Sequence, residues 1–139
     1  MQITSGYEST VMPLARIDLI KGKSVEYRQT IGDAVYRAMV EILKAPEDDR
    51  FQVITEHDEG DLVYDPHFLG VSRSKDIIFI QLTLAEGRTV EQKRGFYKQA
   101  VDDLHKRLGV RREDVFFSLV GTSRDDWSFG NGEASLVKP

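Results

Sequence analysis

Hydrophobic and polar residues follow the same order twice along this chain. Residues 14–20 alternate as a strand with one apolar face does, and residues 51–55 are rich in β-forming side chains. Between them, residues 24–43 carry apolar side chains about one helical turn apart. That stripe consists of Ile31, Val35, Ala38 and Ile42. The pattern predicts a strand, a helix and a strand within residues 13–56.

The second half repeats this order. Residues 77–84 are strand-like, and Thr89 with Gln92 three residues later forms the sequence signature of a capping box. The helix that follows is predicted to end at Gly109, before a strand over residues 115–120. Its predicted apolar stripe consists of Tyr97, Val101, Leu104 and Leu108. Residues 77–120 are thus a second β-α-β unit.

The two units also agree in residue identity. The segment Gly22-Lys23-Ser24-Val25-Glu26 corresponds to Gly87-Arg88-Thr89-Val90-Glu91, and Glu47-Asp48 corresponds to Glu113-Asp114. Agreement in sequence, period and turn chemistry favours an internal duplication over chance.

Two such units predict an α/β (α+β) fold. Each β-α-β connection places its strands parallel, so the prediction is a four-stranded sheet with both helices on one face. The other face is then bare, and self-association through it is expected. Residues 13–139 are predicted to form one domain, with an extension over 1–12 and a polar tail over 121–139. The irregular connection contains a short strand candidate at residues 62–64.

Composition narrows the classes of partner. The net charge is −4 with no block of Lys and Arg, so neither nucleic acid nor an anionic membrane is an expected partner. No apolar run approaches the length of a membrane span, and cysteine is absent, which suits a cytoplasmic protein. The three histidines lack metal-ligand spacing, so no metal is expected.

Met12-Pro13 precedes the first strand and holds the most distinctive chemistry. If translation starts at Met12 and that methionine is removed, Pro13 carries a free secondary amine, which can transfer protons near neutral pH or attack a carbonyl. If residues 1–12 remain, Pro13 is an ordinary amide without basicity. The ordinary alternative for Pro13 is a proline at the first position of a strand.

Other candidates have equally ordinary alternatives. Asp49 can orient water or hold a proton on the amine, but an acid in this position is commonly a solvated turn residue. Arg88 can bind an anion beside a helix N-terminus, or it can be a surface arginine. Trp127 and Phe129 are either substrate contacts or apolar plugs of the tail.

Three motifs together resemble one family. The tail Asp126-Trp127-Ser128-Phe129-Gly130-Asn131-Gly132, the turn Pro46-Glu47-Asp48-Asp49-Arg50-Phe51-Gln52 and the helix start Gly87-Arg88-Thr89-Val90-Glu91-Gln92-Lys93 are similar to the malonate semialdehyde decarboxylase family of the tautomerase superfamily. The resemblance runs from Pro13 to about Val137.

This resemblance implies a homotrimer with no metal or organic cofactor and with a pocket near each N-terminal proline. It assigns catalysis to Pro13 and Asp49, and binding of the substrate carboxylate to two arginines. The second arginine matches Arg88, but the first position is Glu86 in this chain, which places malonate semialdehyde itself in doubt as a substrate.

The favoured hypothesis is a cofactor-independent enzyme that acts on a small oxo or unsaturated carboxylic acid. Keto–enol tautomerisation, decarboxylation and hydration, including hydrolytic dehalogenation of a haloacrylate, all remain open. Pro13, Asp49 and Arg88 are the predicted catalytic residues, and Arg88, Glu86, Trp127 and Phe129 are predicted to contact substrate. The alternative is a non-catalytic trimeric binding or structural protein in which residues 1–12 block Pro13.

Overall fold

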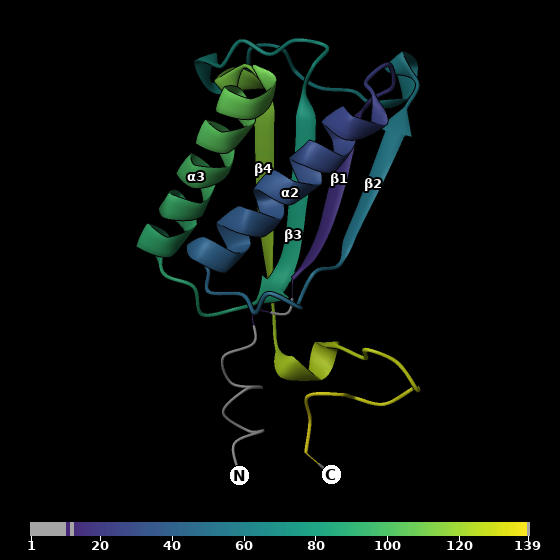
Figure 1. The fold of residues 1–139 in the computed structure, drawn as a ribbon, viewed down its shortest axis with the longest axis vertical. Helices are drawn as coiled ribbons and strands as arrows, with labels where there is room; N and C mark the ends of the chain where they lie inside the picture. The colour runs from purple at the N-terminus through teal and green to yellow at the C-terminus, as the bar shows by residue number, and fades with distance from the viewer. Residues whose placement is uncertain (1–10, 12, 139) are drawn as a thin grey trace.

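The fold is a four-stranded sheet covered on one side by two helices. The computed structural model describes residue 11 and residues 13–138. The main elements in chain order are β1 (Leu14–Ile20), α2 (Val25–Glu41), β2 (Gln52–His57), β3 (Ile78–Ala85), α3 (Val90–Leu108) and β4 (Val115–Thr122). Short 3₁₀ turns lie in the connections and in the tail (Figure 1).

The order of the strands in the sheet is β2-β1-β3-β4. β1 is parallel to β2, and β3 is parallel to β4, as expected for two β-α-β units. β1 and β3 are antiparallel in the centre, with Ile17 opposite Ile80. This confirms the predicted duplicated fold, and it also means that equivalent points of the two units lie at opposite ends of the sheet.

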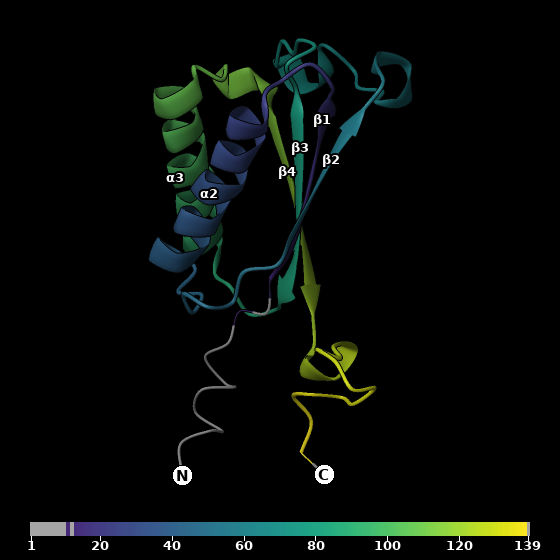
Figure 2. The same cartoon turned by 45° about the vertical axis from the view of Figure 1, so that its right-hand side comes forward.

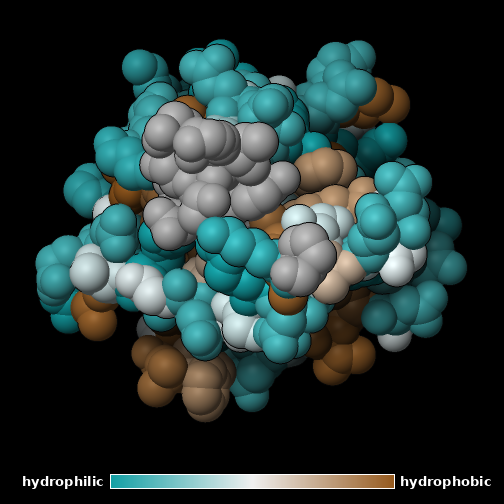
Figure 3. Space-filling view, turned by 90° about the horizontal axis from the view of Figure 1, so that it is seen from below, coloured by the Kyte–Doolittle hydropathy of each residue, from teal (hydrophilic) through white to brown (hydrophobic). Residues whose placement is uncertain are grey.

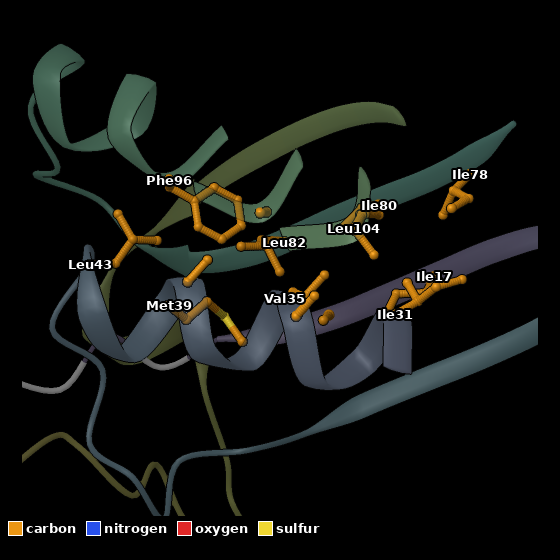
Figure 4. Packing of buried hydrophobic residues seen from close by; sticks show 14 of the residues in the cluster. Ile17, Ile31, Val35, Met39, Leu43, Ile78, Ile80, Leu82, Phe96 and Leu104 are labelled. Carbon is orange, nitrogen blue, oxygen red and sulfur yellow. The ribbon is translucent and has the colours of Figure 1, made fainter. Parts of the chain in front are cut away.

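The core lies between the helices and the inner face of the sheet. Alternate residues of β1 and β3 are buried, as are the inward-facing residues of both helices (Figure 4). Its largest fully buried side chains are Ile17, Ile31, Met39, Leu43, Ile80, Leu82, Phe96 and Leu104. Figure 2 shows both helices on the same side, which leaves the other face without a layer.

Local sequence signals account for the helix ends. Ser24 caps α2, and Thr89 forms the predicted capping box with Gln92 at the start of α3. Gly109 ends α3 in the left-handed conformation (φ 69°) that glycine adopts without steric cost.

The buried stripe of α3 differs from the predicted one. Phe96, Ala100 and Leu104 are fully buried, whereas Tyr97 is partly exposed and packs against Phe117 of β4. The helix faces both α2 and the sheet, so its buried surface is wider than one stripe: Leu104 of the predicted stripe is fully buried, and Phe96 and Ala100 add to it.

The predicted strand at residues 62–64 is wrong, because these residues are irregular. The Arg73 guanidinium holds this connection in place of a strand ladder: its Nη1 donates to the carbonyl oxygens of Asp65, Phe68 and Val71 at 3.1–3.3 Å. Within the described ranges, no helix combines the length and the apolar character needed to cross a membrane.

Candidate functional site

One end of the sheet gathers the predicted site residues. β1 and β2 begin there, and β3 and β4 end there, at the lower end of Figure 1. Two backbone hydrogen bonds join the strands at this end, from Ala15 N to Phe51 O (3.0 Å) and from Ala85 N to Val11 O (2.8 Å). The surface seen from this end has apolar atoms between hydrophilic side chains (Figure 3).

Pro13 is buried at the start of β1. The residues around it pair with β3: Leu14 lies opposite Thr83, and the Val11 carbonyl accepts from Ala85. Val11 is itself fully buried and belongs to the core. In the full chain the Pro13 nitrogen is part of an amide and is not basic. The predicted role as a free amine therefore requires removal of the preceding residues.

Asp49 lies in the turn between α2 and β2. It is half-buried, and its backbone N–H donates to Pro46 O at 3.1 Å. With Pro46, Asp48, Phe51 and Phe129, it lines an open hollow of about 210 Å³. The turn therefore presents a carboxylate to an apolar surface at the same end as Pro13.

Helix α2 holds this turn on both sides of Asp49. The Tyr36 hydroxyl donates to Glu47 O at 2.5 Å, and the Arg50 guanidinium carbon lies 4.5 Å from the centroid of the Tyr36 ring. Arg50 also lies 3.8 Å from Asp33 of the same helix. Contacts before and after Asp49 restrict where its carboxylate can lie.

Arg88 lies between the end of β3 and the N-cap of α3. Its side chain is half-buried, and its Nε is buried without a hydrogen-bond acceptor among the described residues. A buried donor without a partner is costly, and an arginine fork matches the geometry of a carboxylate. An anionic ligand at this position would satisfy the guanidinium.

Glu86 is exposed beside the end of β4. Its N–H donates to Thr122 O at 2.9 Å, and a Cβ added at Gly121 would lie 3.2 Å from the Glu86 Cβ, so glycine at 121 permits this approach. Among the described residues, no ion pair or hydrogen bond involves the Glu86 carboxylate. The residue adds negative charge to the end that carries Arg88.

The tail folds back onto the same end through Thr122. Trp127 Nε1 donates to Thr122 Oγ1 at 2.8 Å, and Thr122 Oγ1 donates to Leu84 O at 2.9 Å. The Phe129 ring stacks on Trp127 with centroids 5.6 Å apart, and Phe129 reaches the hollow with Asp49. Trp127 thus anchors the tail, and Phe129 faces the hollow.

Some contributors were not among the sequence candidates. Val11, Tyr36 and Thr122 hold the surroundings of Pro13, Asp49 and Trp127, respectively. Only Thr122 had a usable sequence signal, a hydroxyl two residues after the last predicted strand, and the observed β4 extends to it. Pro13 and Arg88 do not line the hollow that contains Asp49 and Phe129, although both residues lie at the same end of the sheet as that hollow. Within the part of the chain that the structure describes, no group of three or more His, Asp or Glu side chains is arranged to hold a metal.

Similar proteins place this geometry in a family. Family models described as "Tautomerase enzyme" match residues 49–130 and residues 13–71, the second beginning at Pro13. The chain is 41% identical to the probable tautomerase YusQ of Bacillus subtilis (strain 168) over 127 residues, which cover 91% of this chain and 100% of YusQ.

Solved structures agree with these matches. A malonate semialdehyde decarboxylase inhibited by 3-bromopropiolate is 39% identical, with a TM-score of 0.81 over 88% of this chain and 92% of that one. A fused 4-OT symmetric trimer shares the fold at 21% identity, with a TM-score of 0.71 over 86% of this chain and 94% of that one. The duplicated fold, the Pro13 start of the family match and the two relatives agree: the chain belongs to the tautomerase family of enzymes.

Proposed function

We propose that this protein, once Pro13 is its N-terminus, is a cofactor-independent enzyme acting on a small oxo or unsaturated carboxylic acid. The observation that carries the proposal is the buried Nε of Arg88, which has no acceptor among the described residues and lies at the end of the sheet where Pro13 directly precedes β1. The Arg88 guanidinium would bind a carboxylate, and the Pro13 amine at the same end would act on a carbonyl. The two groups together fit a substrate that has both a carboxylate and a reactive carbonyl.

In tautomerisation the Pro13 amine abstracts the proton on the carbon next to the substrate carbonyl. The C–H electrons form the C=C bond of the enol, and the carbonyl oxygen takes a proton. An α-amine titrates near pH 8, so both protonation states of Pro13 are accessible at neutral pH.

In decarboxylation the Pro13 ammonium donates a hydrogen bond to the carbonyl of a β-oxo acid. The bond between the α-carbon and the carboxylate breaks, CO₂ leaves, and the electron pair forms an enolate, which the ammonium stabilises and which is then protonated on carbon. Hydration of an unsaturated acid instead requires a water molecule activated by Asp49. The relative at 39% identity is a malonate semialdehyde decarboxylase, which supports decarboxylation as a reaction of this site.

Glu86 is proposed to restrict the charge of the substrate. A carboxylate near Arg88 repels a second anionic group, by about 1 kcal/mol if partly desolvated. Monoanionic oxo acids therefore suit the site better than dianionic ones. Trp127 and Phe129 are proposed as its apolar wall.

The proposed assembly is a homotrimer. The uncovered sheet face exposes Val53, Phe116 and Val120, and the connection before β3 exposes Phe68 and Leu69. Apolar residues in these numbers mark an interface. The fused 4-OT relative is a trimer of the same fold, which supports this stoichiometry.

Turnover by a chain with a verified Pro13 N-terminus tests the function. We expect it to convert the enol of phenylpyruvate or a β-oxo acid, and we expect Pro13→Ala to remove this activity. Unchanged turnover in Pro13→Ala would reject proline catalysis. Glu86→Gln should lower the KM for a dianionic oxo acid about fivefold and leave that for a monoanionic one nearly unchanged, as expected from about 1 kcal/mol of repulsion.

The second candidate is a non-catalytic trimeric binding or structural protein. It is favoured by the sequence itself, in which residues 1–12 place the Pro13 nitrogen in an amide. The intact mass of the protein from its native host distinguishes the two. A mass that begins at Pro13 supports the enzyme, whereas a mass that begins at Met1 or Gln2 supports the binding protein.

A further inference from the structure

Val11 lies two residues before Pro13 in the chain. Its side chain is fully buried in the core, and its carbonyl oxygen accepts a hydrogen bond of 2.8 Å from the Ala85 amide. A proline that acts through its nitrogen needs its reaction partner next to that nitrogen, where the preceding residues otherwise lie. Removal of residues 1–12 therefore takes a buried apolar group and a hydrogen-bond acceptor away from the end of the sheet that carries Pro13.

Removal of Val11 leaves the Ala85 N–H without its acceptor. The neighbouring donor remains occupied, because Glu86 N–H bonds Thr122 O at 2.9 Å. Ala85 lies three residues before Arg88, whose Nε is also buried without an acceptor among the described residues. Two donors on one short segment, both without partners, are costly unless a ligand accepts from them.

We infer that the substrate replaces Val11: an oxygen of a small oxo acid accepts from the Ala85 N–H, and its alkyl group occupies the space of the valine side chain. This inference rests on the proposed function and adds a backbone donor and a substrate size to it. The ligand that fits has a short, branched aliphatic chain, and 3-methyl-2-oxobutanoate has the carbon skeleton of valine. The Ala85 N–H also supplies a neutral hydrogen-bond donor at the end of β3. This donor lies next to position 86, where this chain has a glutamate and the related family has its first arginine.

The inference makes a prediction about size. Each additional carbon that enters the space of Val11 buries one more methyl or methylene group, which strengthens binding about fourfold. Affinity should rise from pyruvate to 2-oxobutanoate to 3-methyl-2-oxobutanoate. Phenylpyruvate should bind more weakly than that trend extrapolates, because its ring is larger than the valine side chain that it would replace.

Amide hydrogen exchange followed by NMR tests the inference without relying on turnover. The full chain and a chain with a verified Pro13 N-terminus are compared; the second has a length at which the family folds, because YusQ is matched over its whole length by 127 residues. We expect exchange at Ala85 to be slow in the full chain and on the order of tenfold or more faster after removal of residues 1–12. Saturating 3-methyl-2-oxobutanoate should slow it again. The Ile80 amide in the centre of β3 is the internal control and should not change.

The outcomes separate the inference from the proposed function. If Ala85 exchange is the same in both chains, or does not respond to any of these acids while the Pro13 chain still turns them over, the inference is wrong and the proposed function stands. If Ala85 is protected by ligand but Pro13→Ala retains full turnover, the binding inference stands and proline catalysis is rejected. Isothermal titration with the full chain completes the comparison: binding as tight as in the shortened chain would also contradict displacement of Val11.

Discussion

The two ends of the sheet are built from equivalent parts of the duplicated units, yet their charged residues are used differently. Lys23 and Arg88 are equivalent, each between a strand end and a helix N-cap. Lys23 Nζ lies 2.9 Å from Asp76 and over the Tyr27 ring, and the hydrogen bond that it donates to Asp76 raises the pKa of Lys23. Arg88 instead has a buried Nε without a partner among the described residues.

The turns that precede the two parallel edge strands differ in the same way. Before β4, Asp114 is fully buried and accepts from Ser74 N (2.7 Å), Ser74 Oγ (2.6 Å) and Arg111. Before β2, Asp48, which corresponds to Asp114, and the adjacent Asp49 line an open hollow with Phe129. One end therefore uses its charges to hold the chain together, and the other is the end that we propose binds a ligand. Duplication supplied both ends, and the candidate site lies at the one where the Arg88 Nε has no acceptor among the described residues.

The largest expected effect comes from exchanging the two cations for glutamine. In the Pro13-terminated chain, Arg88→Gln should lower kcat/KM about 100-fold, because it removes charge-assisted hydrogen bonds to the carboxylate. Lys23→Gln is the matched control and should change kcat/KM less than twofold, since it breaks only a partly exposed pair. Steady-state kinetics checks both, and equal effects would end the distinction between the two ends.

Of the two acidic residues, Asp114 should affect mainly stability, and Asp49 should affect mainly activity. Asp114→Asn leaves the Ser74 donors and Arg111 poorly matched in a buried site, so the free energy of unfolding should fall by about 2–3 kcal/mol. Asp49→Asn should leave this free energy within about 0.5 kcal/mol, as for other partly exposed positions, while it lowers kcat. Denaturant titration and kinetics on the same samples measure both quantities. A stability loss in Asp49→Asn as large as that in Asp114→Asn would contradict the division.

A smaller effect is expected at the support of the Asp49 turn. Tyr36→Phe removes the hydrogen bond to Glu47 O and keeps the ring beneath Arg50, so kcat should fall about fivefold, in line with one hydrogen bond. Tyr97→Phe is the control, because no hydrogen bond of the Tyr97 hydroxyl is found among the described residues. If Tyr36 acts through Asp49, the two substitutions should not be additive. Additive losses in the double variant would show an independent role.

The smallest effect concerns the helix pair that supports both ends. Burial raises the pKa of Asp33, but hydrogen bonds from Arg37 and Arg107 outweigh it and hold that pKa below its ordinary value. A lowered folded pKa means stability that is present above the ordinary aspartate pKa and is lost as the pH falls through the lowered value.

The measurement for Asp33 is urea unfolding of the wild type and of Asp33→Asn at pH 7 and at successively lower pH. The variant should be slightly less stable at pH 7, and the difference should shrink below about pH 4. A difference that stays constant into the acid range would show that the ionised carboxylate is not responsible.

The sequence predicted the elements that have local signals. Periodicity located the strands and helices, and Thr89, Gln92 and Gly109 marked the ends of α3 as observed. The predicted stripe of α3 contained Leu104 but not Phe96 and Ala100, because periodicity alone does not reveal that the helix packs against both α2 and the sheet. The false strand at residues 62–64 has β-forming composition, but the side chain of Arg73 imposes a different path.

The site was predictable only as a set of residue types. The proline, the acidic turn and Arg88 followed from motifs, but the hydrogen bond from Ala85 to Val11 and the support of the turn by Tyr36 depend on strand register and helix rotation. Such contacts join residues that are distant in sequence, and no local pattern contains them.

Trp127 is the chain's single tryptophan, and it lies at the end of the sheet that carries the candidate site. Its indole is hydrogen-bonded to Thr122 and stacked on Phe129, whose ring borders the hollow with Asp49. The tryptophan fluorescence of the protein therefore comes from this end alone, without background from another indole. Emission at tryptophan wavelengths becomes a direct optical signal for occupancy of the hollow, and no label has to be introduced.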